Sequence, residues 1–170
     1  MNGMRASAIL GILAAAVYTD LRSERIPNSI IVTGLLLGLA YQLFTGRLAG
    51  LLIFCGGILL PVLMLFGLFC FRMIGAGDIK LLCVVGGFLG PADGAGCLFA
   101  SFLIGGVIAI FRIVCSRSMI KRLTFLAVYV RNYTSAGEWS SYLGQSEKSA
   151  RIHFSVPVLL AVAGYLGGLF

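Results

Sequence analysis

The feature that most constrains this chain is the length of its stretches without a charged residue. Six such stretches follow one another, at residues 6–19, 26–46, 48–71, 81–92, 94–111 and 152–170. About 20 apolar residues in a helix cross the hydrocarbon core of a bilayer. The stretches therefore predict an all-α membrane protein, a bundle of six transmembrane helices. We expect residues 1–170 to form a single transmembrane domain, with residues 112–151 as its one sizeable loop.

The composition excludes the other broad classes of protein. Hydrophobic residues make up 59% of the chain and charged residues 11%, whereas a soluble domain carries about 25% charged residues. The high apolar content also excludes intrinsic disorder. The net charge of +7 is accounted for by anionic lipid headgroups and by the orientation of insertion, so no nucleic-acid partner is expected.

The first and fourth stretches are short for membrane spans. The first reaches the required length if Met1–Arg5 extends it, with the Arg5 side chain reaching toward the headgroups. A cleaved signal peptide is the alternative for this segment. The fourth stretch reaches the required length only if it begins near Ile74, which places Asp78 and Lys80 inside the helix.

The distribution of basic residues orients the bundle. With six spans, the loops on one side carry eleven of the lysines and arginines, and those on the other side carry two. The positive-inside rule places the basic side in the cytoplasm. Both termini are then outside, and segments 20–27, 71–80 and 112–151 face the cytoplasm.

Cysteines and glycines are expected to serve packing. The five cysteines form no Cys-x-x-Cys pair, which argues against a zinc module and a disulfide framework. Glycines four residues apart let helix backbones approach closely in lipid. Such pairs predict contacts within the bundle, with a dimer interface as the alternative; they are Gly34/Gly38, Gly86/Gly90 and Gly164/Gly168.

The chain has only six acidic residues, and four of them are explained by solvent. Glu138 and Glu147 lie in the hydrophilic loop, Asp93 lies in a turn on the outer side, and Glu24 lies in a short polar turn. The other two differ. Asp20 ends the first span and Asp78 opens the fourth, and because these spans run in opposite directions both carboxylates fall at the cytoplasmic boundary. Ionisable groups at such positions are functional candidates.

Two carboxylates at one depth can act together as an acid and a base if they lie next to each other. Like charges about 3 Å apart in a low dielectric do not both ionise, so one carboxyl keeps a proton. The ionised partner can activate water while the protonated partner stabilises the tetrahedral intermediate. This aspartyl peptide hydrolysis needs no metal, cofactor or covalent intermediate. Which Asp is the base stays open, and the alternative is that each Asp only terminates a helix.

The residues around the two aspartates make the hypothesis specific. Asp78 lies in Gly75-Ala76-Gly77-Asp78-Ile79-Lys80, and Asp20 is followed after six residues by Pro27-Asn28. This pair of motifs, in this order and in a six-span layout, resembles the type IV prepilin peptidase family, intramembrane aspartyl proteases of the Gly-x-Gly-Asp class. The resemblance covers nearly the whole chain.

The resemblance implies an activity and a set of site residues. The family removes a short leader from prepilins and pseudopilins at the cytoplasmic face of a bacterial inner or plasma membrane. Its catalytic pair corresponds to Asp20 and Asp78, and its motif residues to Gly75, Gly77 and Lys80. No Cys-x-x-Cys motif is present, so the similarity is to the short branch that serves Flp/Tad-type pili, and N-methyltransferase activity is not assigned.

Several of these residues, and the protein as a whole, have alternative interpretations. Pro27 and Asn28 have a structural interpretation, as the start of the second span. Lys80 could contact lipid phosphates, or could pair with a substrate acid or tune the aspartates. A metal site of Asp20, Asp78 and His153 is conceivable. At the level of the whole protein, the alternatives are an ion- or proton-coupled transporter, a non-catalytic component of a pilus or secretion apparatus, and a eukaryotic-type Gly-x-Gly-Asp protease.

Overall fold

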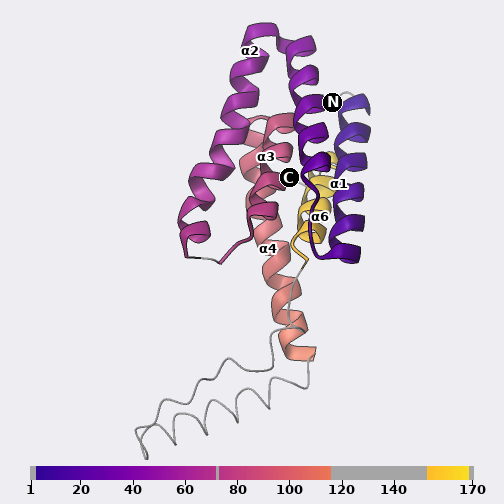
Figure 1. Cartoon of the computed structure of the whole chain (residues 1–170), viewed down its shortest axis with the longest axis vertical. Helices are drawn as coiled ribbons and strands as arrows, with labels where there is room; N and C mark the ends of the chain where they lie inside the picture. The colour runs from indigo at the N-terminus through magenta and orange to yellow at the C-terminus, as the bar shows by residue number, and fades with distance from the viewer. Residues whose placement is uncertain (1–2, 72, 116–152, 169–170) are drawn as a thin grey trace, which may run out of the picture. The chain divides into compact units, whose positions relative to one another are not determined.

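The computed structural model describes residues 3–71, 73–115 and 153–168, and it is helical with no strand in these ranges. The helices are α1 (Gly3–Ser23), α2 (Asn28–Cys70), α3 (Ala76–Leu89), α4 (Pro91–Cys115) and α6 (Ser155–Leu166) (Figure 1). The all-α prediction is confirmed. Most of the expected 112–151 loop, with Glu138 and Glu147, lies outside the described residues.

Contacts divide the chain into two units. The first comprises residues 1–105 and 153–170, and the second comprises residues 106–152. The first unit contains α1, α2, α3, α6 and the N-terminal part of α4. In the second unit the structure describes the last residues of α4, which ends at Cys115. All contacts discussed below belong to the first unit.

Among the residues that the structure describes, three helices are long and apolar enough to cross a membrane, within Arg5–Ser23, Asn28–Cys70 and Pro91–Arg112. The longest, α2, has 43 residues and is interrupted at Arg47, where φ is 49° and ψ is −127°. Figure 1 shows the chain reversing in α2, so that the helix forms two antiparallel arms. The two predicted stretches on either side of Arg47 are these arms.

The fourth and sixth predicted spans are shorter than expected. Helix α3 has 14 residues and α6 has 12 in the described range, which correspond to about 21 and 18 Å. Neither length crosses a hydrocarbon core of about 30 Å unaided. Helix α3 begins at Ala76, two residues after Ile74, so Asp78 and Lys80 lie inside the helix as expected. It ends because Gly90 adopts a φ of 87°, a conformation that favours glycine.

Helix α3 lies at the centre of the packed core. Each of its residues from Leu81 to Leu89 is buried. It contacts α1, α2 and α6, and α1 turns Ile9 and Leu13 inward with no exposed surface. Helix α1 is therefore packed into the bundle. The sequence analysis expected this of the first uncharged stretch.

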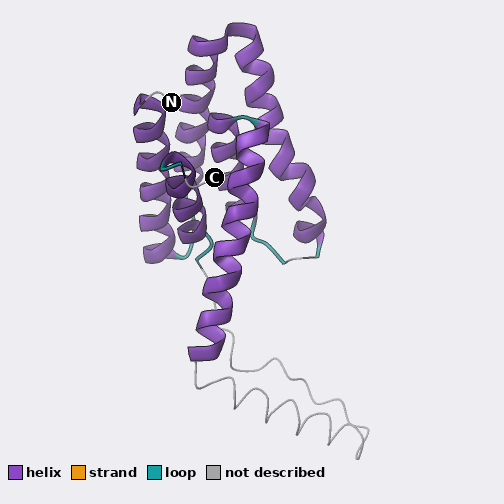
Figure 2. Cartoon of the chain, turned by 180° about the vertical axis from the view of Figure 1, so that it is seen from behind, coloured by secondary structure: helices purple, strands orange, loops and turns teal. Residues whose placement is uncertain are grey.

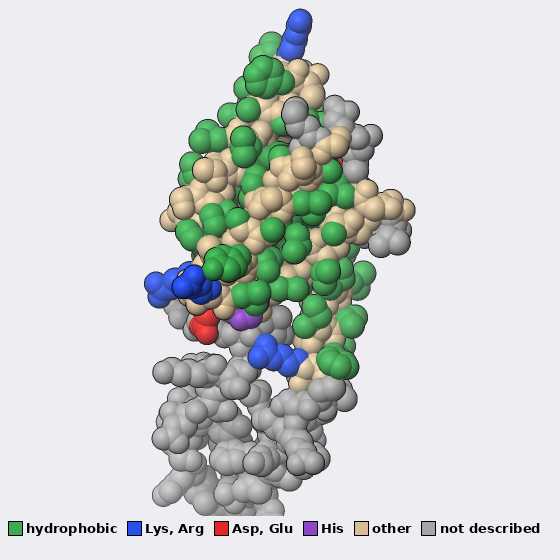
Figure 3. Space-filling view, turned by 90° about the vertical axis from the view of Figure 1, so that its right-hand side faces the viewer, with side chains coloured by type: hydrophobic (Ala, Val, Ile, Leu, Met, Phe, Trp, Pro, Cys, Tyr) green, Lys and Arg blue, Asp and Glu red, His purple; other side chains and the backbone are tan. Residues whose placement is uncertain are grey.

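The outward faces of the helices are apolar. On α2, Phe44 is 90% exposed and Leu48 and Leu52 are more than 70% exposed, values that would be unfavourable in water. Figure 3 shows hydrophobic side chains spread over the visible sides of the helices. Such surfaces are typical of a protein whose solvent is lipid.

Glycines bring α2 and α3 into direct backbone contact. A Cβ atom placed on Gly57 would collide with the carbonyl oxygen of Gly86, and a Cβ on Gly86 would collide with that of Gly57. Gly34 packs against Val84, and Gly38 against Phe88. The prediction that glycines pack within the bundle is confirmed for Gly34, Gly38 and Gly86. Gly57 makes the same kind of contact, although no glycine lies four residues from it in the sequence.

A buried glutamine satisfies the C-terminal end of α3. The last carbonyl groups of a helix have no partner within it. Gln42 on the first arm of α2 is 7% exposed, and its Nε2 donates to the carbonyl oxygens of Gly87 at 3.3 Å and Phe88 at 3.2 Å. The amide therefore replaces water that the apolar surroundings would exclude.

Candidate active site

Asp20 and Asp78 come from different helices that meet at one end of the bundle. Asp20 lies in the last turn of α1 and Asp78 in the first turn of α3. Figure 2 shows the α1–α2 and α2–α3 connections at this same end. The two carboxyl groups are close enough to interact electrostatically. The structure thus places both carboxyl groups that the sequence analysis selected at the same end of the bundle.

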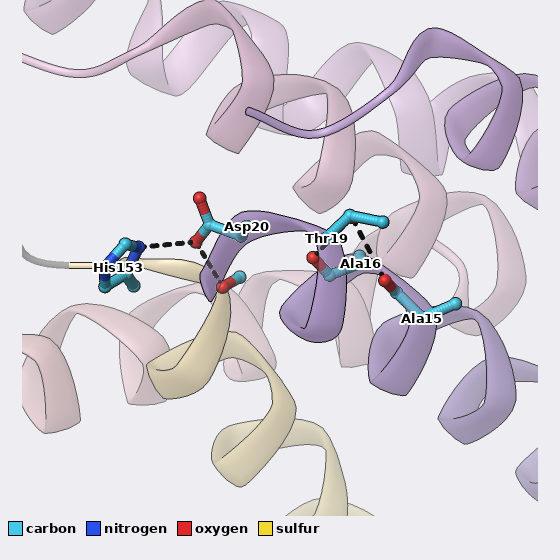
Figure 4. A network of polar contacts seen from close by, with 6 residues as sticks. Ala15, Ala16, Thr19, Asp20 and His153 are labelled. Atoms are coloured by element: carbon cyan, nitrogen blue, oxygen red, sulfur yellow. Dashed lines mark hydrogen bonds and ion pairs between the residues drawn. The ribbon is translucent and has the colours of Figure 1, made fainter. Parts of the chain in front are cut away.

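The Asp20 side chain is buried and bound by the segment that leads into α6. Its residue is 9% exposed. The Ser155 hydroxyl donates to its Oδ2 atom at 2.5 Å, and His153 Nδ1 lies 3.5 Å from the same oxygen. Figure 4 shows both contacts converging on one oxygen of Asp20.

The neighbouring hydroxyl of Thr19 does not compete for Asp20. Its Oγ1 donates back along α1 to the carbonyl oxygens of Ala15 at 3.1 Å and Ala16 at 2.9 Å, as Figure 4 also shows. Thr19 is thus satisfied within its own helix, in the way that hydroxyl side chains commonly are inside helices.

Asp78 is held by the start of its own helix. Gly75 precedes α3 in an extended conformation, with φ −75° and ψ 145°, and its backbone N–H bonds the Asp78 carboxylate. This is the backward-reaching half of a capping box. A Cβ atom on Gly75 would lie 3.2 Å from Asp78 Oδ2, so the missing side chain leaves the half-buried carboxylate uncovered on this side.

Gly77 is less constrained than Gly75. The nearest atoms to a Cβ placed there belong to Ile26, at 3.9 Å. This is an ordinary van der Waals separation, and no close packing demands glycine at this position. The structure therefore gives a local reason for the first glycine of the motif and none for the second.

Lys80 and Asn28 bind each other rather than acting separately. Lys80 Nζ donates to Asn28 Oδ1 at 2.9 Å, which ties the start of α3 to the start of α2. Pro27 occupies the N-cap position of α2, and the helix has no side-chain cap. The expectation that Pro27 and Asn28 open this helix is confirmed, and Asn28 is also the hydrogen-bond partner of Lys80.

Two other charged residues differ from expectation. Asp93 lies in the first turn of α4 instead of in a turn between helices, is half-buried, and is hydrogen-bonded by the Tyr165 side chain. The guanidinium of Arg5 lies 5.8 Å from the centre of the Tyr41 ring, with Nε and Nη2 buried. Solvent does not account for Asp93, and Arg5 does not extend away from the bundle.

A metal centre is not assembled in the part of the chain that the structure describes. Within residues 3–71, 73–115 and 153–168, no group of three histidine, cysteine or acidic side chains is placed to hold an ion. The cysteines Cys55, Cys70, Cys83 and Cys97 are free in this part, and the last two are buried.

Ser155 is the site residue that the sequence analysis missed. It is fully buried, and it follows His153, the single histidine of the chain. No pattern distinguishes a serine that starts a helix from one that binds a carboxylate on another helix. Its role depends on how α6 is placed against α1, which spacing along the chain does not reveal.

Comparison with known proteins places the chain in a family. The model of the type IV leader peptidase family matches residues 7–110, a range that contains Asp20, Asp78 and the whole Gly75–Lys80 motif and ends before α6. Searches of curated proteins and of solved structures gave no match. The family match covers more than half of the sequence and agrees with the motifs on which the resemblance was recognised. The chain therefore belongs to the type IV leader peptidase family.

Proposed function

We propose that this peptidase is an aspartyl endopeptidase that removes the short leader of type IV prepilins or pseudopilins. Cleavage takes place at the cytoplasmic face of a bacterial inner or plasma membrane, and Asp20 and Asp78 form the catalytic pair. What supports the proposal is that Asp20 and Asp78, from α1 and α3, lie at the same end of the bundle and are close enough to interact electrostatically.

The pair supplies both functions that peptide hydrolysis requires. The ionised carboxylate takes a proton from water as the water oxygen forms a bond to the scissile carbonyl carbon. The protonated carboxyl donates to the carbonyl oxygen and stabilises the tetrahedral intermediate. When the intermediate collapses, the C–N bond breaks and the nitrogen leaves as an amine with the proton that the base had taken.

The surroundings of the pair suit a peptide backbone that approaches from the membrane boundary. Asp20 is buried, whereas Asp78 is half-buried and has a glycine on one side. An extended peptide next to Gly75 would meet no side chain from that residue. The prepilin cleavage site precedes a hydrophobic helix, and the apolar outer faces of the bundle would let that helix remain in lipid.

The position of the aspartates favours a hydrolase over a transporter. A coupled transporter places its ionisable groups near the middle of the bilayer, next to broken helices in repeated halves. Here Asp20 and Asp78 lie in the terminal turns of α1 and α3. A non-catalytic pilus component would need neither carboxylate.

A cleavage assay tests the proposal. The full chain is reconstituted in vesicles with a prepilin that carries its leader, and mass spectrometry follows the mature pilin and the released leader. We expect one cut between leader and hydrophobic helix. If the prepilin stays intact while the reconstituted protein is folded, the proposed function is wrong.

The proposed orientation predicts which residues a membrane-impermeant thiol reagent reaches. In a variant without native cysteines, Arg22→Cys and Ala76→Cys should be labelled from the cytoplasm only. Ala92→Cys, in the first turn of α4 just after the C-terminal end of α3 and exposed, should be labelled only from outside. Labelling of residue 22 or 76 from outside would contradict the positive-inside assignment.

A further inference from the structure

The hydrogen bonds around Asp20 distinguish it from Asp78. Asp20 Oδ2 receives the Ser155 hydroxyl at 2.5 Å and faces His153 Nδ1 at 3.5 Å. Asp78 receives a backbone N–H from Gly75 in its own helix. Figure 4 shows the second oxygen of Asp20 pointing away from both of its donors.

The start of α6 explains why the Ser155 hydroxyl is available to α1. A serine near a helix start usually bonds a backbone N–H two or three residues onward. Phe154 is the N-cap of α6, and Pro157, two residues after Ser155, has no N–H. The N–H of Val158, three residues after Ser155, bonds the carbonyl oxygen of Phe154 at 3.3 Å. Ser155 has no exposed surface, and its hydroxyl bonds the Asp20 carboxylate instead.

This contact has a chemical consequence for the pair. A hydroxyl that donates to Oδ2 requires a lone pair on that oxygen, and hydrogen bonds to a carboxylate favour its charged form. The bond is short, as charge-assisted O–H···O bonds are. His153 Nδ1 lies 3.5 Å from the same oxygen and forms an ion pair with it when the imidazole is protonated.

We propose that Ser155 is a positioning residue that keeps Asp20 as the ionised member of the pair and turns its second oxygen toward the attacking water. Asp78 then holds the proton and acts on the scissile carbonyl oxygen. This inference rests on the proposed function, and it adds to it the direction of proton transfer and a residue outside the range matched by the family model.

The experiment compares three serine variants of the full reconstituted chain. Ser155→Ala removes the hydroxyl, and Ser155→Thr keeps it. Ser101→Ala is the matched control, because Ser101 is also fully buried but donates within its own helix, to the carbonyl oxygen of Cys97 at 2.6 Å. The measured quantities are kcat and KM for leader removal and the folded fraction of each variant.

The expected result separates positioning from folding. Ser155→Ala should lower kcat on the order of 10- to 100-fold, the range expected for loss of one hydrogen bond to a charged group, with KM unchanged. Ser155→Thr should recover most of the loss. Ser101→Ala should match the unmodified protein in both constants.

Three results would overturn the inference. The first is a Ser155→Ala variant with the full kcat. The second is a Ser155→Ala variant whose lower activity is explained entirely by a lower folded fraction. The third is a folded Ser155→Thr variant that is no more active than Ser155→Ala. Failure of the proposed function gives other results. In that case the unmodified chain does not cleave prepilin, or Asp20→Asn cleaves as fast as the unmodified chain.

Discussion

Replacement of Asp20 or Asp78 by asparagine is expected to lower the rate of leader cleavage on the order of 10²- to 10⁴-fold, the range that a positioned general acid or base contributes. Asparagine has nearly the shape of aspartate and keeps one oxygen that accepts hydrogen bonds. It can neither take a proton from water nor donate one as a carboxylic acid does. Either substitution alone should therefore remove most of the activity.

The same substitutions should have little effect on folding. In Asp20→Asn the remaining oxygen can still accept the Ser155 hydroxyl, and in Asp78→Asn it can accept the Gly75 N–H. A helix cap changes stability by about 1 kcal/mol. Cleavage rates and thermal unfolding are measured on the same preparations, so that activity per folded molecule is compared.

Asp93→Asn is the matched control for these two variants. Asp93 also lies in the first turn of a helix and is half-buried, but its partner is Tyr165 and it is not part of the proposed pair. We expect this variant to cleave at the rate of the unmodified protein. The aspartyl mechanism would be refuted if Asp20→Asn and Asp78→Asn were as active as Asp93→Asn.

Alanine at Gly57 or Gly86 is expected to cause a large loss of stability. At either position the new Cβ collides with backbone of the other helix, and backbone cannot move aside as a side-chain end can. Overpacking of this kind costs about 1–3 kcal/mol and sometimes more. Because the two helices must separate at their closest contact, we expect a lower unfolding temperature and a smaller folded fraction.

Two other glycines provide the comparison. A Cβ atom on Gly11 or Gly96 meets nothing within 4 Å, and alanine favours a helix over glycine by about 1 kcal/mol. Gly11→Ala and Gly96→Ala should therefore unfold at the temperature of the unmodified protein or above it. The close contact between α2 and α3 would be in doubt if Gly86→Ala behaved as Gly96→Ala does.

The sequence was sufficient to predict the all-α fold and the shared end of Asp20 and Asp78, but not the short lengths of α3 and α6. Charges are excluded from the apolar layer, so uncharged stretches mark the helices, and Arg47 marks the point where α2 reverses. The alternating direction of successive helices placed Asp20 and Asp78 at one end. These properties follow from position along the chain, which is why they can be predicted without a structure.

The contacts between helices could not be predicted in the same way. The bonds of Asp20 with Ser155 and His153 depend on how α6 is rotated and shifted against α1. The contact of Gly57 with Gly86 likewise depends on how the second arm of α2 meets α3. The spacing of residues does not reveal how two helices are rotated or shifted against each other. It shows which side chains share a face of one helix, and that face is the same whichever helix packs against it.

The short length of α3 gives this peptidase a degree of independence from its membrane. A helix that touches lipid must match the thickness of the hydrocarbon layer, or tilt and distort it. Helix α3 is buried from Leu81 to Leu89, so its neighbours, and not the lipid, determine how deep it lies. The depth of Asp78 is thus a property of protein packing, and its position relative to Asp20 can be kept in bilayers of different thickness.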